Sequence, residues 1–147
     1  MTDKKKFNPT ARRWSRRLAL QAMYQWQMGG QSITEIELQF CRDENIGKSD
    51  IPYFNELLQA IPMLHEALDR QLQPFLEGRS LAELDPIELA ILRIGAYELE
   101  KRLDIPGRVI INEAVEQAKT FGATESFKYV NGVLDQLART LRSKEFT

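Results

Sequence analysis

Residues 84–103, LDPIELAILRIGAYELEKRL, carry the sequence signals of a helix whose two ends are both marked. Asp85 and Pro86 predict an N-cap followed by a first-turn proline, and Glu88 stands three residues after the cap, as in a capping box. Near the other end, Lys101 favours the negative end of the helix dipole. These signals predict a helix of about five turns in the middle of the second half of the chain.

The apolar residues of this helix cover nearly its whole circumference. Gly95 adds a place where another helix can approach closely. A helix that is apolar all round is either buried or spans a membrane, and Arg93 and Glu98 make spanning too costly. We therefore expect the central helix of an all-α core, with Arg93 either paired with a nearby carboxylate or contacting a ligand. The two apolar stripes are Ile87, Ile91 and Ile94 on one side, and Leu92, Ala96 and Leu99 on the other.

With 147 residues, 43% of them hydrophobic, the chain can bury one good core or two small bundles. Its single cysteine, Cys41, excludes a disulfide framework and a cysteine metal site, and we expect it to be a small buried residue. We expect no metal and no cofactor. The basic start runs into an arginine-rich helix rather than an apolar run, so neither a signal peptide nor a membrane span is predicted, and the expected location is the cytoplasm.

Charge is distributed unevenly along the chain. Residues 1–17 contain seven basic residues and Asp3, a net charge of +6, whereas the other 130 residues sum to −7. We interpret residues 1–9, with Lys4 to Lys6, as a flexible basic arm and residues 10–147 as a single helical domain. The basic residues 1–17 suggest a polyanion as ligand, and the acidic remainder of the chain suggests a basic partner.

Three-and-four spacing of apolar residues predicts further helices on both sides of the central one. Pro62 should bend or break the helix expected over residues 51–75, and Thr124 or Ser126 should cap the helix expected over residues 126–141. The count is six to seven helices with no strand pattern, in one domain or two small packed bundles. The lone His65 has no catalytic partner beside it. The expected additional helices are 10–28, 32–41, 51–75, 106–121 and 126–141.

Arg12, Arg13, Arg16 and Arg17 crowd the first two turns of the first helix, where they oppose the helix dipole and repel one another. Local stability does not explain them, so they either form a solvated face or meet phosphate. The interleaved Trp14 either stacks on a base or forms the rim of the core.

Four segments together resemble the NusB family of bacterial transcription antitermination factors, in the same order and over essentially the whole chain. The resemblance implies an all-α fold of two perpendicular three-helix subdomains without catalytic activity. It also implies binding of the single-stranded boxA element of ribosomal RNA leaders, together with the ribosomal small-subunit protein NusE, within the RNA polymerase antitermination complex. The segments are ARRWSRRLALQAMYQW, LDPIELAILRIGAYEL, IINEAVEQAKTFG and ESFKYVNGVLDQLA.

The resemblance assigns roles to ten residues. NusE would lie against the first and central helices, near Tyr24, Glu83 and Glu88. Tyr129 stands where the family often has phenylalanine; it lies off the apolar stripe of its helix and is either an RNA contact or a partly packed residue. The implied RNA contacts are Arg12, Arg13, Arg16, Lys119, Glu125, Lys128 and Tyr129.

The sequence also bears on two other classes of function. A similar helical domain leads certain ribosomal RNA cytosine methyltransferases, so a pure protein-interaction module is the alternative. An enzyme is disfavoured because the chain has no glycine-rich cofactor loop and no convergent set of titratable groups; in ENIGKSD, the first glycine of a phosphate loop would fall at Arg42. Both a monomer and a homodimer that hides the basic face are compatible with the sequence.

Overall fold

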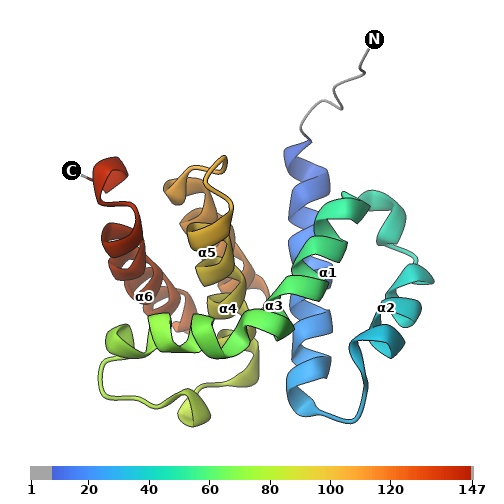
Figure 1. Cartoon of the computed structure of the whole chain (residues 1–147), viewed down its shortest axis with the longest axis horizontal. Helices are drawn as coiled ribbons and strands as arrows, with labels where there is room; N and C mark the ends of the chain where they lie inside the picture. The colour runs from blue at the N-terminus through green and yellow to red at the C-terminus, as the bar shows by residue number, and fades with distance from the viewer. Residues whose placement is uncertain (1–7, 147) are drawn as a thin grey trace.

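The computed structural model of the chain describes residues 8–146, and this part of the chain is entirely helical (Figure 1). Residues 1–7 of the predicted basic arm, with Lys4 to Lys6, lie outside the described residues, whereas Asn8 and Pro9 already belong to the start of the first helix. Six α-helices and four short 3-10 turns account for the architecture, which confirms the predicted all-α class. The α-helices are α1 (Pro9–Met28), α2 (Ile33–Cys41), α3 (Ile51–Leu72), α4 (Pro86–Lys101), α5 (Gly107–Phe121) and α6 (Ser126–Leu141). The 3-10 turns are η1 (Ile46–Lys48), η2 (Gln73–Phe75), η3 (Leu81–Glu83) and η4 (Ser143–Phe146).

Side-chain caps explain where most of the helices begin. Asn8 accepts a hydrogen bond from the backbone N–H of Ala11 and starts α1, and Ser32 starts α2 through a reciprocal capping box with Glu35. Asp85 accepts hydrogen bonds from the first turn of α4, as predicted. Glu88, however, does not complete a capping box at this end, because its side chain turns into the protein interior.

Helix α4 is the centre of the fold. Every residue from 90 to 99 is buried, and α4 packs against α1, α3, α5 and α6. At Gly95 a Cβ atom would lie 2.7 Å from the Leu134 side chain of α6, so the absence of a side chain permits the close approach that the sequence indicated. The buried Arg93 is held by two hydrogen bonds to the Asp69 carboxylate, of 2.9 and 2.7 Å, which confirms the structural interpretation of this arginine.

The helices pack in two groups of three, as predicted. α1, α2 and α3 contact one another, and α4, α5 and α6 contact one another. Helix α3 runs from beside α1 and α2 across to the side of α6, and both α1 and α3 contact α4 (Figure 1). The buried residues nevertheless form one continuous core. Helix α1 begins and η4 ends at the same edge of the molecule.

Two expectations for local structure were wrong, and a third is narrowed. Cys41 is exposed rather than buried. Helix α3 continues across Pro62, which excludes a break there and leaves the predicted bend as the remaining alternative. Neither Thr124 nor Ser126 caps α6; the cap position is Glu125, in a left-handed conformation with φ of 71°, and its side chain makes no capping hydrogen bond.

Candidate nucleic-acid interface

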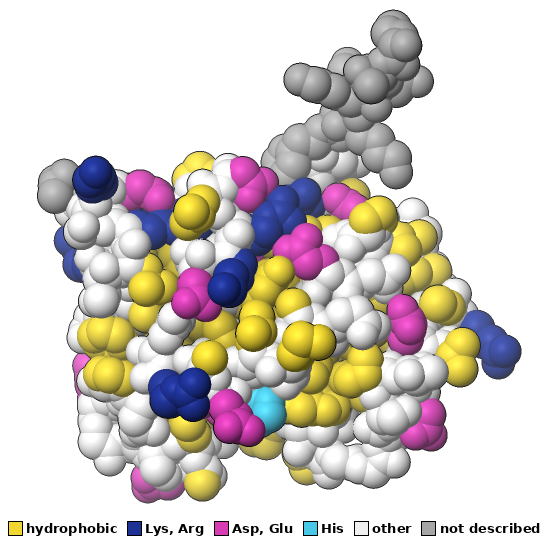
Figure 2. Space-filling model, in the orientation of Figure 1, with side chains coloured by type: hydrophobic (Ala, Val, Ile, Leu, Met, Phe, Trp, Pro, Cys, Tyr) yellow, Lys and Arg dark blue, Asp and Glu magenta, His cyan; other side chains and the backbone are white. Residues whose placement is uncertain are grey.

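The arginines at the start of α1 do not share one environment. Arg12 donates to Asp50 at 3.1 Å and lies 4.0 Å from the centre of the Tyr53 ring. Arg13 forms a two-pronged ion pair with Glu113 of α5, with N···O distances of 3.1 and 2.8 Å, and about half of its side chain stays exposed. Figure 2 shows Lys and Arg side chains interleaved with Asp and Glu beside the start of α1. Carboxylates outside α1 thus offset the electrostatic repulsion between Arg12 and Arg13.

Arg16 points into the protein. Its guanidinium donates to the Glu98 carboxylate of α4 at 2.8 to 3.0 Å, and only 4% of the residue is exposed. Burial alone would lower the pKa of Arg16, but the charge and hydrogen bonds of Glu98 outweigh it and raise that pKa. Tyr53 also donates its hydroxyl to Glu98. In this structure Arg16 offers no exposed surface for a direct RNA contact, which corrects its assignment: it links α1 to α4.

A groove between α1 and α5 brings two of the predicted contacts together. Arg13 and Lys119 both line it, in a volume of about 420 Å³, and the carboxylates of Glu113 and Glu116 line it as well. Farther along, Arg17 and Gln117 line the next hollow between the same two helices. Successive turns of α1 therefore face successive turns of α5, so residues about one hundred positions apart in the sequence become neighbours.

The start of α6 adjoins this groove. The Lys119 ammonium lies 5.3 Å from the centre of the Phe127 ring, which connects the end of α5 to the first turn of α6. Lys128 and Glu125 are both exposed and form an ion pair at 2.6 Å. Lys119 therefore joins the groove to the start of α6 through Phe127.

Tyr129 is half-buried, which is compatible with both packing and RNA contact. Its hydroxyl donates to the Leu76 carbonyl at 2.9 Å, and burial raises its pKa. The Arg79 guanidinium lies 4.5 Å from the centre of its ring. Sequence reasoning missed Arg79, because a residue in a loop fifty positions away carries no local signal that it will face this tyrosine.

Trp14 is also half-buried, and its ring has two cations against it. The Arg17 guanidinium lies 5.1 Å from the ring centre and the Lys48 ammonium 4.7 Å from it. Lys48 is a second cation that sequence reasoning left out of the site, since it belongs to the loop that was set aside as a false phosphate-loop match.

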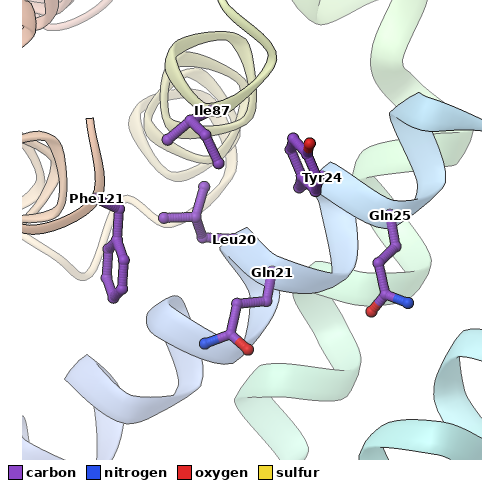
Figure 3. A pocket seen from close by; sticks show the side chains of 6 residues that line it. All are labelled: Leu20, Gln21, Tyr24, Gln25, Ile87 and Phe121. Carbon is purple, nitrogen blue, oxygen red and sulfur yellow. The ribbon is translucent and has the colours of Figure 1, made fainter. Parts of the chain in front are cut away.

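A second groove, apolar in character, lies farther along α1 (Figure 3). It has a volume of about 250 Å³, and Leu20 of α1 lies there near Ile87 of α4 and Phe121 of α5. Tyr24 and Phe121 are 36% and 38% exposed, so two aromatic rings are available at its surface. Its lining is completed by Gln21, Tyr24 and Gln25.

The three predicted partner-binding residues differ in their exposure and contacts. Tyr24 lines the apolar groove. Glu83 is exposed on η3, where the Ser80 N–H donates to its carboxylate and lowers its pKa. Glu88 is buried: it accepts a hydrogen bond from the Ser126 hydroxyl at 2.7 Å and pairs with Arg79 at 3.4 Å. Its assignment to the partner surface is corrected, because it joins α4 to the start of α6.

The geometry gives an all-helical protein with a charged groove, in which Arg13 and Lys119 alternate with Glu113 and Glu116, and an apolar groove farther along α1. Among residues 8–146, no group of three or more His, Cys, Asp or Glu side chains could hold a metal ion. None of the helices in this range is long and apolar enough to cross a membrane.

Comparison with known proteins assigns this architecture to a family. Residues 13–139 match the NusB family, and the chain belongs to it. It is 53% identical to the transcription antitermination protein NusB of Alcanivorax borkumensis, over 93% of this chain and 91% of that protein. It is 54% identical to the protein of the same name from a Marinomonas species, over 97% of this chain and 83% of that protein. Among solved structures, NusB from T. maritima matches with a TM-score of 0.76 and 28% identity, covering 91% of this chain and 95% of that one.

Proposed function

We propose that this chain acts in transcription antitermination, without catalysis and in the cytoplasm, by binding single-stranded boxA RNA together with NusE in the RNA polymerase antitermination complex. The observation that carries the RNA proposal is the convergence of Arg13 and Lys119 on one groove, which reaches the start of α6 at Phe127. Exposed cations aligned over several turns suit a phosphate backbone.

The chemistry favours a single strand over a duplex. The planar guanidinium of Arg13 can donate two hydrogen bonds to one phosphate or to a base edge. Trp14 and Tyr129 place aromatic rings beside cations, and unpaired bases stack on such rings. Glu125 borders the same surface, where its carboxylate can accept a hydrogen bond from a base amino group.

Partner binding is proposed for the apolar groove with Tyr24 and Phe121. Aromatic residues that are partly exposed in a hollow are typical anchors of protein interfaces. Glu83 is exposed on the turn before α4, and residues 18–147 carry a net charge of −7, which favours a basic partner such as NusE. A basic partner bound to the acidic part of the chain, residues 18–147, would add its own contacts to RNA phosphates. We therefore expect the heterodimer of this chain and NusE to be the RNA-binding species.

The test is a salt series of binding measurements with fluorescent boxA RNA and a scrambled RNA, each with and without NusE. We expect NusE to strengthen binding of boxA more than binding of the scrambled RNA. Contact with about four phosphates would give a slope of log K against log salt of about −0.7 per contact. Equal affinity with and without NusE would contradict the heterodimer, and equal affinity for both RNAs would reduce the groove to a non-specific surface.

Arg13→Gln tests the groove itself, and Arg42→Gln is the matched control. Arg42 is exposed at the C-cap of α2, and α2 lies on the opposite side of the molecule from α5 and α6 (Figure 1). Arg13→Gln should weaken RNA binding about tenfold by removing a charge-assisted contact, whereas Arg42→Gln should leave it nearly unchanged. Equal losses in the two variants would mean that only net charge matters.

A further inference from the structure

A polar hollow of about 180 Å³ lies on the other side of α5, bounded by α5, α6 and η4. It is smaller than a pocket for a drug-sized molecule, which measures about 300 to 1,000 Å³. Asn112 lines both this hollow and the groove with Arg13 and Lys119, so the two are adjacent across one turn of α5. The lining consists of Arg108, Ile111, Asn112, Asn131, Asp135, Arg139 and Phe146.

Two guanidinium groups converge on one aromatic ring in this hollow. Those of Arg108 and Arg139 lie 5.9 and 5.5 Å from the centre of the Phe146 ring. Asp135 pairs with Arg139 at 2.9 Å, whereas Arg108 has no carboxylate partner in the described range 8–146. Of the charged residues that line the hollow, two are positive and one is negative. The hollow therefore has an excess positive charge.

Local stability does not account for Arg108. It is the second residue of α5, whose first turn holds no acid, and a cation at that end opposes the helix dipole. The carboxylate of Glu145 already caps the helix at the Gly107 N–H and also pairs with Arg142. An anion that binds from outside would complete the charge balance.

Two carboxamides face the same hollow. Asn112 and Asn131 are exposed, and neither side chain hydrogen-bonds to another residue within the described part of the chain. A carboxamide offers both a donor and an acceptor, which is what a base edge requires and what a simple anion does not. The combination of two guanidiniums and two carboxamides is suited to a nucleotide rather than to a free phosphate.

From these observations we infer that the hollow binds one further nucleotide of the RNA strand held in the groove between α1 and α5. Its phosphate lies between Arg108 and Arg139, and its base edge meets Asn112 and Asn131. This inference rests on the proposed function, because the strand must first occupy the neighbouring groove. It adds a contact beyond the residues that the family resemblance assigns.

The experiment compares three RNAs, in the presence of NusE: boxA alone, boxA extended at the 5′ end and boxA extended at the 3′ end. The unchanged protein should bind one of the extended RNAs more tightly than boxA alone. Arg108→Gln should abolish that gain, weakening the extended RNA about tenfold and reducing its salt slope by about 0.7, with no change for boxA alone. Asn131→Ala should reduce the same gain.

Arg42→Gln is again the control and should preserve the gain. Thermal unfolding of Arg108→Gln should show unchanged or slightly higher stability, since the lost cation opposes the dipole. If Arg108→Gln weakens all three RNAs equally, or none of them, while the unchanged protein still binds boxA, the inference is wrong. If inorganic phosphate at millimolar concentration removes the gain as effectively as a mononucleotide does, the hollow is a phosphate site without base contacts. Failure of the unchanged protein to bind any of the RNAs overturns the proposed function as well.

Discussion

At the scale of single residues, the Arg16 guanidinium keeps its charge inside the protein because Glu98 is placed against it. Glu98→Ala would leave that buried charge with only the longer contact to Glu113, at 3.6 Å, and would also remove the acceptor of the Tyr53 hydroxyl. We expect the free energy of unfolding to fall by about 3 to 5 kcal/mol, which is typical when one partner of a buried ion pair is removed. Urea unfolding followed by circular dichroism measures it.

Glu116→Ala is the matched control for this variant. Glu116 is exposed in the next helix, and no ion pair joins it to another residue of the described segment. Its removal should change stability by less than about 0.5 kcal/mol. Similar losses in both variants would mean that Glu98 acts only through the overall charge of the protein.

Asp104 gives a second prediction at this scale, on pH. Hydrogen bonds from Arg102 lower the pKa of Asp104 from 3.8 to about 2. Because the pKa is lower in the folded state, the ion pair contributes stability above about pH 4 and loses it as the pH falls toward 2. An NMR titration of the Asp104 carboxyl should give a midpoint near 2, and Arg102→Gln should raise it. A midpoint that does not move in Arg102→Gln would exclude this arginine as the cause.

At the scale of secondary-structure elements, the contact between α4 and α6 depends on Gly95. Alanine would gain up to about 1 kcal/mol of helix propensity. Its Cβ would, however, lie 2.7 Å from the fully buried Leu134 side chain, and such overpacking costs about 1 to 3 kcal/mol. We expect Gly95→Ala to lower the free energy of unfolding by about 1 kcal/mol.

The test of this contact is a double-mutant cycle. In a Leu134→Ala background the clashing atoms are gone, so Gly95→Ala should no longer destabilise the protein and should show the propensity gain instead. Stabilisation by Gly95→Ala in the unchanged background would contradict the close approach of the two helices.

The elements themselves could largely be predicted from the sequence, because their signals are local. Apolar spacing and the cap Asp85 placed the helices correctly. Interactions between distant segments could not be predicted in this way. Arg142 hydrogen-bonds to the Leu99 carbonyl at the end of α4, and no spacing pattern links these two positions. The burial of Arg16 was missed for the same reason: its partner, Glu98, lies 82 positions away.

At the scale of the whole molecule, one pair of helices positions both candidate surfaces. Turns of α1 and α5 face one another along their lengths, so Arg13 lies at the cation-lined groove and Phe121 at the apolar groove. A partner bound at the apolar groove would therefore stand beside the RNA path without covering it. This arrangement allows cooperation without a change of shape, since two ligands on adjacent grooves can contact each other directly.

The last prediction is that the two surfaces can be separated by mutation. Tyr24→Ala removes an anchor of the apolar groove and should weaken NusE binding by about 2 kcal/mol, roughly thirtyfold, without changing RNA binding in the absence of NusE. Arg13→Gln should weaken RNA binding without changing NusE binding. Calorimetry with NusE and fluorescence with boxA RNA measure the two affinities. Leu38→Ala, which removes an exposed apolar side chain from α2, should affect neither. If Tyr24→Ala weakens the RNA affinity of the isolated protein, the two grooves form one surface and the partner's contribution must arise elsewhere.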